Sequence, residues 1–168
     1  MDSNAARPKG LAQISYREFT RHYKKVMQRN PGEHALLFVH LTGPTSPMEE
    51  ALLVLDSQVF KDVAERVLVS NGKFGSLTTM PERGFALFVR DCSERRALQL
   101  ARLFRHTLQN SEIHAAGQSF YMGISTGVVT VTQPIDLGQL IDSARHACLL
   151  ARQKGHNRIE IGALLAGL

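Results

Sequence analysis

Apolar residues at the start of the chain recur at the spacing of a helix. Between residues 15 and 30 they stand every four positions: Phe19, Tyr23 and Met27. This spacing places side chains on one face of a helix. Ser15 and Glu18 form a capping box, a typical signal for the first turn. The pattern therefore predicts a helix over this segment, ended by the Pro-Gly pair that follows.

The same reading predicts an alternation of helices and strands along the rest of the chain. Further helices are expected over about 48–69, from residue 91 or 93 to 110, and over 136–153. Strands are expected over 35–41, 76–80, 84–90, 111–115, 120–131 and 158–161. The turn sequence PERG joins the strands over 76–80 and 84–90 into a hairpin. The order predicts an α+β sandwich of the ferredoxin-like kind, with a mostly antiparallel central sheet flanked by helices.

The composition of the chain indicates its domain organisation and its cellular location. Residues 1–12 are expected to be a disordered segment or linker, 13–162 the domain, and 163–168 a tail or the start of a linker to a further domain. The sequence has no long apolar run and no signal-peptide core. Cys92 and Cys148 are the two cysteines of the chain and form no CxxC motif. We therefore expect a cytoplasmic protein with reduced thiols.

The charge balance is basic, with 20 Lys and Arg against 15 Asp and Glu and a net charge of +5. The basic residues are dispersed, and many stand at helical spacing beside acids. Dispersed cations of this kind indicate solvated helix faces rather than a phosphate-binding groove.

Several blocks of sequence resemble the GGDEF, or diguanylate cyclase, family. SARHACLLARQKGHNRIEI (143–161) resembles the family's closing segment AD-x-ALY-x-AK-x-x-GRNRV, and MGISTGVV (122–129) its strand SIGVA. FALFVRDC (85–92) follows the position of the GGDEF hairpin, and LLFVHLTG (36–43) is similar to LLFLDLDGF. VAERV (63–67) resembles the end of the intervening helix. The blocks keep the family's spacing over residues 15–161, which implies the nucleotidyl-cyclase-like GGDEF fold.

The resemblance also implies a chemistry that this chain departs from. Diguanylate cyclases join two GTP molecules with the help of two divalent cations, which are held by carboxylates. The positions that match these carboxylates carry His40 and Arg83. A neutral imidazole is a poor ligand for Mg²⁺, and a guanidinium repels it. We therefore expect no metal and no cofactor.

The nucleotide-binding positions depart in the same way. The five signature positions carry Pro81, Glu82, Arg83, Gly84 and Phe85. The guanine-reading positions carry Met48 and Ser57, and Thr45 replaces the lysine that contacts the phosphate. Gly72 and Gly75 stand at the positions of the product-binding RxxD motif. Pro81 and Glu82 remove the two glycines that let the backbone approach GTP. Arg152 stands where the family has a lysine, either as a residual phosphate contact or as a surface residue.

These departures predict a catalytically inactive regulatory or interaction module of a cyclic di-GMP signalling protein. Its expected partners are proteins: a second copy, or an adjacent EAL, PAS or receiver domain. One alternative is a divergent GTP sensor or cyclase that uses Glu82, Glu49 or Glu50. Another is a nucleic-acid-binding sheet with Phe38, Phe85, Phe88 and Tyr121, although these aromatics fit core positions. A softer metal at His40 would need further ligands, which do not stand at ligand spacing.

Overall fold

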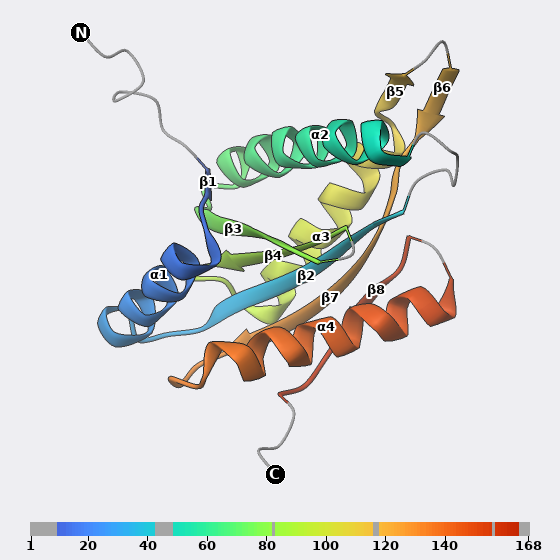
Figure 1. Cartoon of the computed structure of the whole chain (residues 1–168). Helices are drawn as coiled ribbons and strands as arrows, with labels where there is room; N and C mark the ends of the chain where they lie inside the picture. Colours follow the sequence, from blue (N-terminus) through green and yellow to red (C-terminus); the bar gives the residue numbers. More distant parts are fainter. Residues whose placement is uncertain (1–9, 43–48, 82, 116–117, 156, 165–168) are drawn as a thin grey trace, which may run out of the picture.

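The computed structural model describes residues 10–42, 49–81, 83–115, 118–155 and 157–164. A six-stranded sheet lies between two layers of helices (Figure 1). The helices are α1 Tyr16–Arg29, α2 Glu49–Ser70, α3 Glu94–Gln109 and α4 Leu137–Lys154. The strands are β1 Leu11–Gln13, β2 His34–Thr42, β3 Gly75–Met80, β4 Gly84–Val89, β5 Glu112–Ala115, β6 Gln118–Tyr121, β7 Gly123–Val131 and β8 Ile159–Ile161. The predicted fold class is confirmed.

The main sheet has the order β1-β3-β4-β2-β7-β8. The two outer pairs, β1–β3 and β7–β8, are parallel, and the three inner pairs are antiparallel. The sheet is therefore mostly antiparallel, as expected. β2 lies near its centre and pairs along all nine of its residues with β7.

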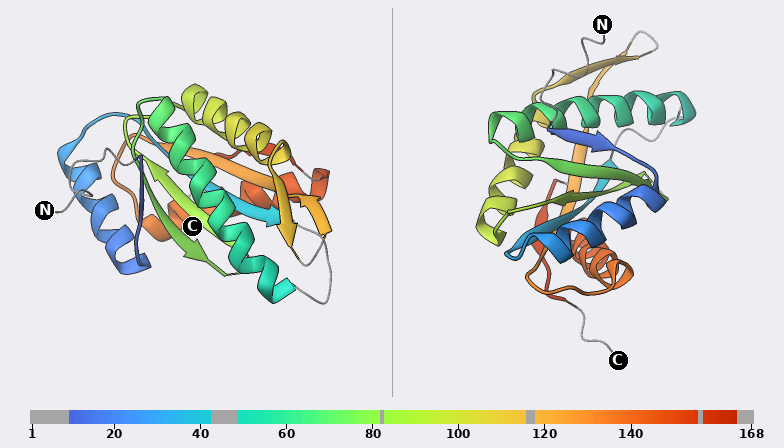
Figure 2. Two further views of the ribbon diagram at one scale, coloured as in Figure 1. Left: turned by 90° about the horizontal axis from the view of Figure 1, so that it is seen from above. Right: turned by 90° about the vertical axis from the view of Figure 1, so that its left-hand side faces the viewer.

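Each face of the sheet carries its own hydrophobic core. Leu37 and Val39 of β2 pack in the core covered by α2 and α3, whereas Leu36 and Phe38 pack in the core covered by α1 and α4. Figure 2 shows the two helical layers on opposite sides of the sheet. A strand that is buried on both faces needs apolar residues at successive positions. This explains why residues 35–41 read as a nearly unbroken apolar run.

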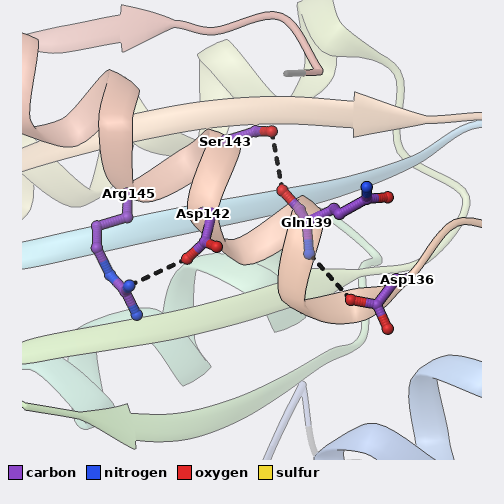
Figure 3. Close-up of polar contacts among 5 residues, drawn as sticks. All are labelled: Asp136, Gln139, Asp142, Ser143 and Arg145. Carbon is purple, nitrogen blue, oxygen red and sulfur yellow. Dashed lines mark hydrogen bonds and ion pairs between the residues drawn. The ribbon is translucent and has the colours of Figure 1, made fainter. Parts of the chain in front are cut away.

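Side-chain caps begin three of the helices at the residues that the sequence indicated. Ser15 accepts a hydrogen bond from the Glu18 N–H at 3.2 Å, and Ser93 accepts one from the Arg96 N–H at 3.1 Å. Asp136 accepts from the Gln139 N–H at 3.3 Å (Figure 3). Each cap satisfies a backbone donor that has no partner within its helix. Of the two start residues predicted for α3, Ser93 is the one that caps it.

Two predictions, one of the N-terminal linker and one of a strand, need correction. The sheet begins at Leu11, inside the segment expected to be linker, because β1 pairs with β3 from Leu11↔Gly75 to Gln13↔Leu77. The continuous strand predicted over 120–131 is wrong. β6 pairs with β5 in a separate two-stranded sheet that projects beyond the main sheet in Figure 1, and β7 starts at Gly123, where its pairing with β2 begins.

In the part of the chain that the structure describes, no helix is both long enough and apolar enough to span a membrane.

Candidate functional site

A pocket of about 370 Å³ lies where β2, the β3–β4 hairpin and α4 meet. It is lined by Phe38, His40, Pro81, Arg145, Cys148, Leu149 and Arg152. His40, Pro81 and Arg152 were singled out from the sequence, and the fold brings all three to this one place. The remaining four lining residues were not predicted as site residues.

Small residues stand beside the two β2 residues that line this pocket. Beside His40 stand Gly84 of β4 and Ser125 of β7, and beside Phe38 stand Ala86 and Gly127. Residues paired across strands have their side chains on the same face of the sheet. The two glycines allow close packing at the edge of the pocket, because the Phe38 ring lies against Gly84 and the α4 backbone lies against Gly127.

Gly127 sets how closely α4 can lie against the sheet. A Cβ atom at this position would lie 2.1 Å from the Ala144 carbonyl oxygen and 2.4 Å from the Cys148 nitrogen. Both are backbone atoms of α4, so no side-chain rotation could relieve the contact. The glycine thus holds the helix, and with it one wall of the pocket, at a fixed distance from β7.

The aromatic ring of Phe38 lies against Gly84, the fourth signature position. A Cβ atom on Gly84 would lie 3.0 Å from Cζ and 3.2 Å from Cε1 of this ring. Arg145 covers the ring from α4, with its guanidinium carbon 5.4 Å from the ring centroid. This is the geometry of a cation–π contact. Arg145 also pairs with Asp142, one turn earlier in α4, at 3.1 Å (Figure 3).

The two positions that match the family's metal-binding carboxylates lie close to each other. His40 pairs with Gly84 across the β2–β4 ladder, and Arg83 directly precedes Gly84. Arg83 has φ +62°, in the left-handed region, and its carbonyl accepts a hydrogen bond from the Leu41 N–H at 3.1 Å. The turn therefore presents an arginine next to the end of β2 that carries the histidine.

Cys148, one turn before Arg152 in α4, is a buried residue of the pocket lining. Its thiol donates a hydrogen bond to the Ser125 carbonyl at 3.3 Å. Burial raises the pKa of this thiol to about 11, although the nearby positive charge of Arg152 acts in the opposite direction. The thiol is therefore protonated at neutral pH and acts as a small apolar lining group.

Several predicted positions fall where the structure gives no account of them. Thr45, Met48 and Glu82 lie outside the described residues, and the side chains of Ser57, Glu49 and Glu50 are not described. Their proposed roles stay predictions. Of the two product-site positions, Gly72 follows α2 with φ +65°, and Gly75 begins β3. Within the described ranges, no three His, Cys, Asp or Glu side chains gather as metal ligands.

The aromatic residues considered for nucleic-acid stacking are placed differently from one another. Phe85 and Phe88 are buried, and Phe38 is 6% exposed. The expectation that Tyr121 fits the core is wrong, since it is 58% exposed on the projecting β6 strand. No sheet surface among the described residues therefore presents these four aromatics together.

Comparison with known proteins decides the family. Residues 53–158 match the family described as "Diguanylate cyclase, GGDEF domain". The chain belongs to the GGDEF domain family. No curated protein sequence matches it significantly.

Solved structures of GGDEF domains share the fold at low sequence identity. The GGDEF domain of FimX from Pseudomonas aeruginosa is 16% identical, with a TM-score of 0.73 over 88% of this chain and 93% of its own. The active GGEEF domain of a diguanylate cyclase from Vibrio cholerae is 11% identical, with a TM-score of 0.69 over 88% and 93%. The diguanylate cyclase SiaD of P. aeruginosa, in complex with its activator SiaC, is 12% identical, with a TM-score of 0.71 over 88% and 58%.

Proposed function

We propose that this GGDEF domain is a non-catalytic regulatory module of a cyclic di-GMP signalling protein. It acts through contacts with proteins, either in dimerisation or in passing a signal to a neighbouring domain such as an EAL domain. We place it in the cytoplasm. The solved complex of SiaD with its activator SiaC is an example of a diguanylate cyclase that binds another protein.

The adjacency of His40 and Arg83 carries this proposal. A cyclase needs carboxylates here to hold cations that polarise the α-phosphate. An imidazole and a guanidinium at neighbouring positions supply no anionic ligand, and the arginine adds a fixed positive charge. Bound metal would therefore be opposed by electrostatics as well as by the missing ligands.

Two further observations support the same conclusion. Pro81 has no N–H to offer a phosphate, whereas the family's glycine at this position has one. The Phe38 ring lies within 3.0–3.2 Å of where a Cβ of residue 84 would be, so a glutamate restored there would require the ring to move. Substituting one or two signature residues therefore does not rebuild the reaction centre.

The proposal is tested by calorimetric titration of the purified domain with GTP and with cyclic di-GMP in the presence of Mg²⁺. The same samples are assayed for product, with an active GGEEF domain run in parallel as the positive control. We expect no product. Product from the wild-type domain would overturn the proposal, and GTP binding without turnover would make the domain a nucleotide sensor.

A further inference from the structure

One stripe of α4 alternates charged and apolar side chains along the pocket. Arg145, Leu149 and Arg152 stand at i, i+4 and i+7, and all three line the pocket. Residues at these spacings share a face of a helix. At a rise of about 1.5 Å per residue, the two arginines are separated by roughly 10 Å along the helix axis, with the leucine between them.

The apolar part of this stripe is open to solvent. Leu149, the apolar residue of this stripe, is 44% exposed, although the opposite face of α4 is buried. Phe38 and Pro81 add apolar lining inside the pocket. Leu149 and the apolar lining of the pocket thus form one continuous apolar surface rimmed by arginines, and such a surface is typical of a site that binds another protein.

The charge of the stripe is positive and incompletely neutralised. No aspartate or glutamate is among the described lining residues of the pocket. Arg145 has a carboxylate partner in Asp142, whereas Arg152 has no ion-pair partner among the described residues. A ligand that fits therefore offers an anionic group to Arg152 beside an apolar group for the pocket, and a second anionic group can reach Arg145 by replacing its exposed partner Asp142.

We propose that this pocket and stripe bind an amphipathic acidic helix of a partner protein. An apolar side chain of that helix enters the pocket beside Leu149, and two carboxylates seven residues apart pair with Arg145 and Arg152. Helix-in-groove recognition uses anchors at this spacing. The inference rests on the proposed function and names the partner chemistry for it.

A nucleotide matches the same surface less well than an acidic helix. The charge of a triphosphate is concentrated in one place, whereas these two cations are separated by about 10 Å and a leucine. Pro81 also offers no N–H to a phosphate at the hairpin. Carboxylates spaced along a helix match the positions of both arginines and keep the leucine covered.

The probe is a synthetic helical peptide, acetylated and amidated, with two glutamates seven residues apart and two leucines between them. It is titrated into the ¹⁵N-labelled domain and followed by amide chemical shifts. We expect the shifts to map to α4 and β2. Arg152→Glu should weaken binding by about tenfold or more, because it places like charges opposite each other in the complex.

Charge reversal supplies the decisive control. A peptide with lysine in place of the glutamate opposite Arg152 should bind the wild type weakly and regain affinity for Arg152→Glu. Arg102→Glu makes the same charge change on the exposed surface of α3 and should leave the affinity unchanged. Circular dichroism checks that each variant folds.

Three results would overturn the inference: no binding of the acidic peptide, an equal loss of affinity in Arg102→Glu, or GTP binding to this pocket more tightly than the peptide. These are separate from the test of catalysis. A domain that makes no product and binds no peptide would leave the regulatory proposal intact and would remove this surface from it.

Discussion

His34 is a buried polar side chain whose two ring nitrogens both have hydrogen-bond partners, and it joins two connections of the fold. Its Nε2 lies 2.8 Å from the Asn30 carbonyl, and its Nδ1 lies 2.9 Å from the Asp91 N–H. Nδ1 must accept from Asp91, so the proton belongs on Nε2, which then donates to Asn30. One neutral imidazole thus ties the end of α1 to the turn after β4, where Asp91 has φ +51°.

Replacing His34 should destabilise the domain. His34→Ala leaves the Asp91 N–H and the Asn30 carbonyl without this partner and opens a cavity, so the free energy of unfolding should fall by about 2 kcal/mol or more. Unfolding in urea would measure this decrease in the free energy of unfolding. His146→Ala, at an exposed position of α4, is the matched control and should change stability by less than about 0.5 kcal/mol. Equal effects of the two changes would contradict this assignment.

The two cysteines should not react with thiol-alkylating reagents in the folded protein. Burial raises the pKa of Cys92 and of Cys148 to about 11 in each case, so both thiols are protonated at pH 8. The thiolate is the reactive form. Iodoacetamide at pH 8 should therefore modify neither residue until denaturant is added, and mass spectrometry would show this. Stoichiometric labelling of the native domain would mean that one thiol is accessible.

At the scale of residues, the sequence could predict part of the pocket. His40, Pro81 and Arg152 were found because a resemblance supplied a template for their positions. Phe38 was named only as a core residue and as one of four aromatics in the nucleic-acid-binding alternative. Arg145 and Leu149 share a helical stripe with Arg152, but nothing in the sequence says which stripe of α4 faces the end of β2. That depends on strand register and helix packing, which are set by long-range contacts.

The packing of α4 on β7 depends on Gly127, and this can be tested directly. Gly127→Ala would place a Cβ 2.1 Å from a backbone oxygen of α4, so the helix must shift. We expect a loss of about 3 kcal/mol of stability, or failure to fold. Gly138→Ala is the control, because there the new Cβ approaches the side chain of Asp136 closely and no backbone atom. Its effect should stay within about 1 kcal/mol. Similar losses in both variants would refute the packing argument.

One hydroxyl group links α1 to the segment before α4. Tyr23 donates a hydrogen bond to the Ile135 carbonyl at 2.9 Å, and its ring packs edge-on against Phe88. Tyr23→Phe keeps the ring and removes the hydrogen bond, so we expect a loss of about 1 kcal/mol. Thermal unfolding would detect it. Tyr16→Phe, at an exposed residue of the same helix, should leave the melting temperature unchanged.

Among the elements, helices were the more predictable class. Their periodicity and caps are local properties, and the residues that begin α1, α3 and α4 could be identified from the sequence. β1 has three residues and little pattern of its own, so it is defined by its pairing with β3. The break at Met122 falls inside an apolar run and results from a change of partner, from β5 to β2. Partner choice is non-local, and periodicity does not encode it.

The domain as a whole should unfold in one step. β2 contributes side chains to both hydrophobic cores, so neither core can be lost without the other. Far-ultraviolet circular dichroism and tyrosine fluorescence should give the same midpoint in urea, since the chain has three tyrosines and no tryptophan. Two separate transitions would show that the helical layers are independent.

The close contact at Gly127 also has a mechanical consequence. The backbones of α4 and β7 are in close contact at Gly127, and β7 is joined to β2 along nine residue pairs. A force applied to the outer surface of α4 would therefore be transmitted through β7 to β2 in the middle of the sheet. The β5–β6 hairpin, which belongs to a separate sheet, would be spared most of that strain.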